Sequence, residues 1–175
     1  ALLAVINNTG ENYFAFTNKL QLVKFSNRAL IATTQVKASI INTICMDNKG
    51  DIWVGINKGV AVYSGKDLSV VATYTAASGL SDNAVNYIYK DAEGNMWIGT
   101  DGDGLFRFSG GAFAKFDNSN GLPGNIVMGI VKDKSENIFI GTREGGLLQY
   151  NPGSKTMYTI EYSMFSKAGI NCMAA

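Results

Sequence analysis

Short apolar segments, separated by turns that contain glycine and aspartate, recur along the whole chain. Near the centre of the sequence four of them follow one another, at residues 84–91, 95–100, 105–108 and 113–116. The first carries Val85, Tyr87 and Ile88 in close succession, which is typical of a strand buried on both faces. Both prolines, Pro123 and Pro152, lie outside these segments, as strand hydrogen bonding requires. The pattern predicts four short strands joined by tight turns.

This four-strand unit is repeated. The stretches DNKGDIWVGINKGVAVYS (47–64), DAEGNMWIGTDGDGLFRFS (91–109) and DKSENIFIGTREGGLLQYN (133–151) share an aspartate, an aromatic residue six positions later and a glycine two positions after that. The aromatic residue is Trp53, Trp97 or Phe139, at spacings of 44 and 42 residues. A weaker copy over residues 7–25 puts Tyr13 at the same place, 40 residues before Trp53. Four-stranded units at this period predict the blades of a β-propeller.

We therefore expect an all-β fold of propeller blades, each made of four antiparallel strands, in a single propeller segment over residues 1–175. The blades are expected near residues 1–37, 38–80, 81–122 and 123–165, with the first strand of a fifth blade at 169–175. Four blades and one surplus strand favour an open fragment of a larger propeller, and a closed four-bladed ring is the alternative. An open fragment exposes blade faces and strand edges, so self-association is expected.

The residues that repeat are expected to be architectural. The aromatic residues Tyr13, Trp53, Trp97 and Phe139 are predicted to fill the space between adjacent blades. The glycines that follow three of them, Gly55, Gly99 and Gly141, are predicted to leave room for the neighbouring backbone. An aspartate also recurs before the first turn of each unit, at Asp47, Asp91 and Asp133. It could line a channel, but an aspartate-capped turn is favoured, because glycine follows three residues later in two copies and Asp side chains cap such turns.

Composition excludes several functional classes. The 15 Lys and Arg residues nearly balance the 14 Asp and Glu residues, so no strong field is available to attract nucleic acid or anionic lipid. No apolar run approaches the roughly 20 residues of a membrane helix. Histidine is absent, which removes Ser/His/Asp and Cys/His catalysis and the HExxH zinc site. Cys45 and Cys172 show no CxxC spacing and are expected to be small core residues. No metal or cofactor is expected.

The stretch GLSDNAVNYIYKDAEGNMWIGTDGDGLFRF (79–108) resembles the two-component regulator propeller repeat, and GLPGNIV (121–127) fits the segment between blades of that family. The first unit departs from the pattern, with Tyr13 for Trp and Ala15 for Gly. The resemblance implies the periplasmic sensor region of a bacterial hybrid histidine kinase, which responds to oligosaccharides without chemistry of its own. The kinase would lie outside these 175 residues.

The repeats are also similar to those of streptogramin B lyase, a propeller enzyme that relies on histidine. Because this chain has no histidine, that activity is not expected.

The side chains that do not repeat are the candidates for ligand recognition. If the first strand of each blade runs away from the segment between blades, the second-to-third turns and these segments share one end of the blades. This end is predicted to carry Asn57, Lys58, Asp101, Asp103, Arg143 and Glu144 from the turns, with Ser81, Asp82, Asn83 and Asn125 from the segments between blades. Their mixed charge and hydrogen-bonding capacity suit a neutral sugar. The alternative is that they are ordinary solvated turn residues.

Two further interpretations concern the acidic residues in this set. Asp101-Gly102-Asp103-Gly104 begins like a calcium-binding loop, but a tight hairpin is favoured because no third carboxylate follows in register. Asp101 and Glu144 could also act on a glycosidic bond, which would make the chain a carbohydrate-active enzyme. The remaining alternative is a protein-interaction scaffold with no small-molecule ligand.

Overall fold

The computed structural model describes residues 2–8 and 12–160. It contains sixteen β-strands and one 3-10 turn (η1, Ala76–Ser78). The strands are β1 (Leu2–Asn8), β2 (Asn12–Thr17), β3 (Gln21–Ser26), β4 (Ala29–Gln35), β5 (Ile41–Met46), β6 (Ile52–Ile56), β7 (Gly59–Tyr63), β8 (Val70–Tyr74), β9 (Val85–Lys90), β10 (Met96–Thr100), β11 (Leu105–Ser109), β12 (Ala112–Phe116), β13 (Val127–Lys132), β14 (Ile138–Thr142), β15 (Leu147–Asn151) and β16 (Thr156–Ile160).

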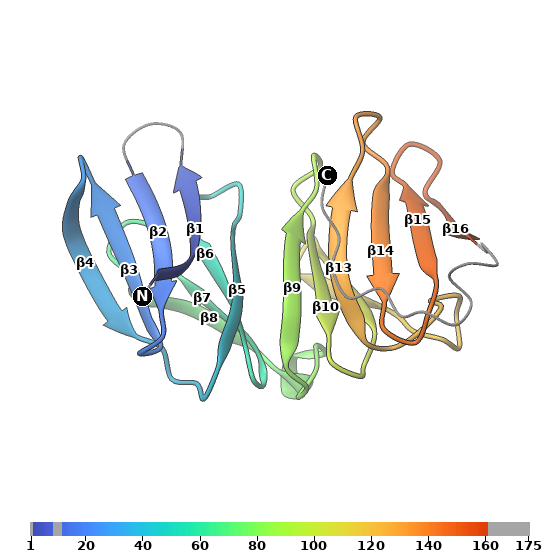
Figure 1. The fold of residues 1–175 in the computed structure, drawn as a ribbon, viewed down its shortest axis with the longest axis horizontal. Helices are drawn as coiled ribbons and strands as arrows, with labels where there is room; N and C mark the ends of the chain where they lie inside the picture. Colours follow the sequence, from blue (N-terminus) through green and yellow to red (C-terminus); the bar gives the residue numbers. More distant parts are fainter. Residues whose placement is uncertain (1, 9–11, 161–175) are drawn as a thin grey trace. The chain divides into compact units, whose positions relative to one another are not determined.

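The strands form four sheets of four, each in the simple order of the sequence (Figure 1). Every pairing between successive strands that the structure defines is antiparallel. The predicted all-β fold of four-stranded propeller blades is therefore confirmed. The chain divides into two compact units, Ala1–Val85 and Asn86–Ala175, and each unit is described by itself. The expected strand at residues 169–175, together with Cys172, lies outside the described residues.

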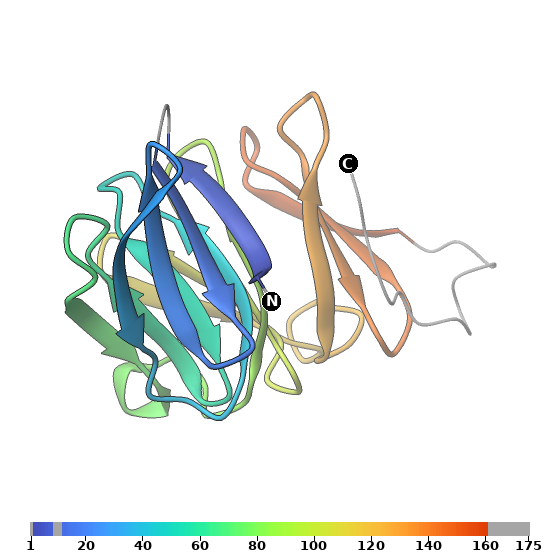
Figure 2. The same ribbon diagram turned by 60° about the vertical axis from the view of Figure 1, so that its left-hand side comes forward.

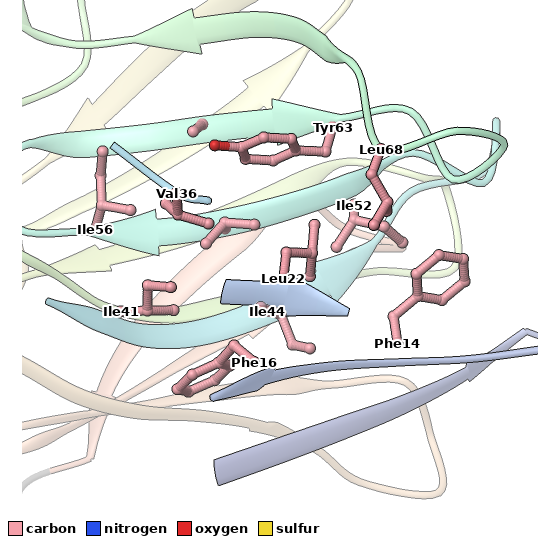
Figure 3. Packing of buried hydrophobic residues seen from close by; sticks show 12 residues of the cluster. Phe14, Phe16, Leu22, Val36, Ile41, Ile44, Ile52, Ile56, Tyr63 and Leu68 are labelled. Atoms are coloured by element: carbon pink, nitrogen blue, oxygen red, sulfur yellow. The ribbon is translucent and has the colours of Figure 1, made fainter. Parts of the chain in front are cut away.

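In the first unit the sheets β1–β4 and β5–β8 bury one apolar core between them (Figures 2 and 3). Phe14, Phe16 and Leu22 come from the first sheet and are at most 3% exposed. They share this cluster with side chains of the second sheet that include Ile52 and Tyr63. Neither sheet could bury this apolar face alone, so the packing of one blade on the next stabilises both.

The structure corrects the predicted place of Tyr13. Phe14, not Tyr13, points into the core between the two blades, while Tyr13 is 38% exposed. Phe14 pairs across the strands with Lys24, whose ammonium lies 5.8 Å from the ring centroid. Because side chains alternate between the faces of a strand, an alignment shifted by one residue assigns them to the wrong face.

In the second unit Trp97 fills the space between two blades, as the repeat predicts. Its side chain is fully buried, and its ring centroid lies 6.0 Å from Phe116 of its own blade and 4.8 Å from Tyr150 of the next. Arg107 lies over both Trp97 and Tyr150, and its Nη1 donates a hydrogen bond to the Tyr150 hydroxyl at 3.0 Å.

The other two aromatic positions differ from Trp97 in their surroundings. Trp53, which is 3% exposed, stacks on Tyr74 of its own blade with centroids 5.3 Å apart. Phe139 is only half-buried. Cys45 is also half-buried on β5, and is not the core residue that the sequence predicted.

The recurring aspartates cap the first turn of their blades. The Oδ1 atom of Asp47 accepts hydrogen bonds from the backbone N–H groups of Lys49 and Asp51, at 2.8 and 3.0 Å. Asp91 and Asp133 accept equivalent bonds, which confirms the predicted aspartate-capped turn.

The second carboxylate oxygen has a role that the sequence analysis missed. It accepts the indole N–H of the tryptophan six residues later, at 3.0 Å for Asp47–Trp53 and 2.8 Å for Asp91–Trp97. Phe139 has no such donor, and there the Asn137 amide donates to Asp133 at 2.8 Å, as the Asn95 amide does to Asp91 beside the Trp97 indole.

At Gly55 and Gly99, two of the three glycines that follow the aromatic residues, the room is taken by a valine side chain of the next blade and not by its backbone. A Cβ atom on Gly99 would lie 2.4 Å from Cγ1 of Val127, the first residue of β13. A Cβ atom on Gly55 would lie 2.8 Å from Cγ1 of Val85, the first residue of β9. An asparagine amide fixes each valine backbone as well, since Asn86 donates to the carbonyl oxygen of Val127 at 3.2 Å.

We expect Gly99→Ala to destabilise the protein by about 1–3 kcal/mol, because the added methyl group meets the fully buried and branched Val127. Urea unfolding followed by tryptophan fluorescence measures the change. The matched control is the same substitution in a Val127→Ala background. There the added methyl group has room, so the loss of unfolding free energy should be smaller. An equal cost in both backgrounds would show that the contact with Val127 is not the cause.

The turn between β7 and β8 carries a second testable feature. Leu68 has a left-handed backbone, with φ 61°, yet its side chain is 3% exposed within the core of the first unit. The preceding Asp67 holds the turn, because its Oδ1 accepts the hydroxyl of Ser69 at 2.7 Å and the N–H of Ser69 at 3.0 Å. These two bonds lower the pKa of Asp67 from 3.8 to about 2.

A carboxyl group whose pKa is lower in the folded chain stabilises the fold above its unfolded pKa and loses that effect as the pH falls. The melting temperature of wild type should therefore exceed that of Asp67→Asn at pH 6, and the difference should close between pH 4 and pH 2. Ser69→Ala removes the hydroxyl donor and should narrow the difference at pH 6. A difference between wild type and Asp67→Asn that does not change with pH would contradict this account.

Candidate functional site

The turn between β10 and β11 lies against the segment that leads into β13. The N–H groups of Gly102 and Gly104 both donate to the carbonyl oxygen of Asn125, at 3.2 and 2.9 Å. Within the turn the N–H of Thr100 donates to the carbonyl oxygen of Gly104 at 3.0 Å, and both glycines have a positive φ. The hairpin interpretation of Asp101-Gly102-Asp103-Gly104 is thus confirmed. So is the expectation that these turns and the segments between blades share one end.

Ile126 is the point where three predicted residues meet. Asp101 forms an isolated antiparallel bridge with it. The N–H of Arg143 donates to its carbonyl oxygen at 2.9 Å. Its own N–H donates to the Glu144 carboxylate, with both oxygens at 3.2 Å. Two turns from neighbouring blades of the second unit, β10–β11 and β14–β15, are therefore tied to a single residue.

The side chains around Ile126 differ in how firmly they are held. Arg143 Nη1 and Asp101 Oδ1 are 4.0 Å apart, and the side chains are 52% and 46% exposed. Such an exposed pair contributes little to stability, about 0–1 kcal/mol. Glu144 is an exposed residue, but its carboxylate is fixed by the Ile126 N–H. Asp103 is half-buried, and its N–H donates to the Thr100 hydroxyl at 3.1 Å.

The first unit contains the same backbone arrangement with different side chains. The N–H of Gly59, at the β6–β7 turn, donates to the carbonyl oxygen of Asn83 at 3.3 Å, as Gly104 does to Asn125. Asn57 accepts the backbone N–H of Ser39 at 2.8 Å through its Oδ1, so its side chain holds a loop. Lys58 is exposed.

The predicted residues of the segments between blades mainly organise those segments. Ser81 is buried and accepts the N–H of Asn83 at 2.9 Å, and Asp82 accepts the N–H of Ala76 at 3.3 Å. The Oδ1 of Asn125 accepts the N–H of Asn118 at 2.9 Å. These positions are therefore better described as residues that hold their turns than as ligand-recognition residues, and Ser81 is buried and not solvated. Asp101, Arg143 and Glu144 remain as the side chains that one unit brings together.

Other kinds of site find no support in the described parts of the chain. Over residues 12–160 no group of three or more His, Cys, Asp and Glu residues is arranged to hold a metal ion. The same residues include no helix with the length and hydropathy of a membrane span.

Two segments of the chain, residues 36–58 and 79–102, match the model of the Two component regulator propeller family. The resemblance inferred from the repeats is thereby confirmed. No curated protein matches the chain.

Solved structures share the fold. The extracellular domain of BT3049 from B. thetaiotaomicron, described as a hybrid two component system, is 24% identical over 91% of this chain, with a TM-score of 0.75. The extracellular domain of BT4673 from the same organism is 18% identical over 97% of this chain, with a TM-score of 0.73. The chain spans 23% and 22% of the lengths of these two structures.

An enzyme shares the fold at a lower identity. A catalytically inactive virginiamycin B lyase from Staphylococcus aureus, solved with quinupristin, is 12% identical over 94% of this chain and 57% of its own, with a TM-score of 0.75. At these identities the solved structures establish the fold alone, and the function must be argued from the residues.

Proposed function

We propose that this chain is a propeller segment of the extracytoplasmic, periplasmic sensor region of a hybrid two-component system. In this proposal it binds an oligosaccharide without covalent chemistry, and a kinase outside this chain receives the signal. The observation that carries the proposal is the family-model match over residues 36–58 and 79–102. The second matched segment reaches Asp101 in the β10–β11 turn, so the family repeat includes part of the candidate site.

The chemistry around Ile126 supports a sugar ligand. Asp101 and Glu144 offer acceptors only, and Arg143 offers donors only. Sugar hydroxyls both donate and accept, so they can satisfy both kinds of group on a solvated surface. A ligand that bridges the turns of two blades would favour one arrangement of the receptor over another, which is how binding energy becomes a signal. Pairing of receptor copies belongs to this proposal.

A scaffold that binds proteins is the second candidate function. One specific observation favours it: aliphatic side chains on the outer strands of the first unit are strongly exposed. Leu30 and Ile31 on β4 are 58% and 57% exposed, and Val70 and Val71 on β8 are 63% and 55% exposed. Edge strands with such side chains are suited to pairing with another chain.

An enzyme acting on a glycosidic bond is less well supported. General-acid catalysis by a carboxyl group usually depends on a partly apolar environment that keeps it protonated. Asp101 and Glu144 are both exposed residues, and Glu144 already accepts a backbone N–H. This arrangement suits binding better than proton transfer.

A thermal-shift screen of the 175-residue chain against neutral and acidic oligosaccharides tests the proposal. A sensor segment should gain about 2.7 kcal/mol of stability when the sugar is present at a hundredfold excess over its dissociation constant. The neutral members of the panel are malto-, manno-, xylo- and galacto-oligosaccharides. The acidic members are oligogalacturonate and heparin fragments. No stabilisation by any of them would overturn ligand sensing and favour the scaffold, and release of shortened sugars would favour the enzyme.

A further inference from the structure

We infer that Asp101 and Arg143 form hydrogen bonds with two neighbouring hydroxyls of an uncharged sugar. In this inference Glu144 contributes a carboxylate that is held in a fixed position on the adjoining turn. This inference rests on the proposed function and narrows it to one unit, three side chains and one class of ligand.

Two features position the Glu144 carboxylate: a hydrogen bond from the Ile126 backbone N–H, and the absence of a side chain at Gly124. Both oxygens lie 3.2 Å from the Ile126 backbone nitrogen, and one N–H uses a small part of a carboxylate's capacity as an acceptor. A Cβ atom at Gly124 would lie 2.3 Å from Oε2 and 2.9 Å from Cβ of Glu144. Any other residue at position 124 would therefore displace the carboxylate.

Asp101 and Arg143 are fixed at the backbone, and their exposed side chains face each other as a loose ion pair. Both are tied to Ile126, one by a β-bridge and the other by the 2.9 Å hydrogen bond from its N–H. Their charged groups stand 4.0 Å apart, which is longer than a direct hydrogen bond. A hydroxyl can donate to the Asp101 carboxylate while its neighbour accepts from the Arg143 guanidinium. The pair is exposed and weak, so little is lost when a sugar takes its place.

Charge around the pair selects against acidic sugars. Asp101, Asp103 and Glu144 are three carboxylates on these two turns, and Arg143 is the one cation of the four predicted residues there. A uronate or a sulfate group would meet an excess of negative charge. The equivalent turn of the first unit carries Asn57 and Lys58, so the same backbone arrangement there lacks this acidic set. The β10–β11 and β14–β15 turns are therefore suited to neutral sugars.

Isothermal titration of the 175-residue chain with the neutral oligosaccharides named above tests the inference. Asp101→Asn and Arg143→Gln should each raise the dissociation constant about tenfold or more, because each removes a charged hydrogen-bonding group from the sugar. Lys134→Ala is the matched control: it removes an exposed charge from the β13–β14 turn of the same unit and should leave binding unchanged. Oligogalacturonate and heparin fragments should bind more weakly than the neutral sugars.

Gly124→Ala tests whether the position of the Glu144 carboxylate matters when its charge is unchanged. It keeps every charged group but displaces the Glu144 carboxylate, so it should weaken binding as much as Glu144→Gln does.

Thermal unfolding of each variant identifies any that has lost its fold. Asp101→Asn lies on the exposed surface and then remains as the test. If neutral sugars bind but Asp101→Asn and Arg143→Gln leave the affinity unchanged, this inference fails and the proposed function stands. Tighter binding of the acidic fragments also overturns it, and absence of binding by every sugar overturns the proposed function.

Discussion

The contact between a glycine on the second strand of one blade and a valine at the start of the next inner strand is the constraint on which each unit depends. It appears at Gly55 with Val85 and at Gly99 with Val127. At both places an asparagine amide, from Asn42 or Asn86, donates to the carbonyl oxygen of the same valine. The side-chain contact limits how closely the two strands approach, and the hydrogen bond ties the valine backbone to the first strand of the preceding blade.

The sequence was sufficient to predict the blades, because strand period, turn residues and repeat length all indicated the same architecture. It was insufficient where one residue decides the face of a strand. Residues 13 and 14 are both aromatic, and only their packing shows that Phe14 enters the core while Tyr13 stays exposed. The hydrogen bond that the Trp97 indole donates to Asp91 was accessible in principle, since the two residue types recur six positions apart. It was missed because turn capping already accounted for the aspartate.

The candidate site was predictable to a similar degree. The pattern of turns indicated which residues share one end of the blades, and hydrogen bonds to Asn125 and Ile126 bear this out. A sequence does not show which polar residues of a loop hold its backbone and which remain available to a ligand. Asn57 and Glu144 are both polar residues of a second-to-third turn, but Asn57 accepts the backbone N–H of Ser39 and Glu144 accepts that of Ile126. Backbone contacts between segments distant in the sequence decide that difference.

A cation over the second-strand aromatic residue occurs in two blades, at Phe14 with Lys24 and at Trp97 with Arg107. Val62 and Gln149 pair with Trp53 and Phe139 in the other two. Each cation also reaches a partner on the following blade, the carbonyl oxygens of Gly65 and Lys66 or the hydroxyl of Tyr150. The cation, its aromatic ring and its acceptor therefore repeat once for every two blades. Shuffling of single blades between such proteins would separate a cation from its acceptor, so the pair of blades is the smallest part that can be exchanged with its chemistry intact.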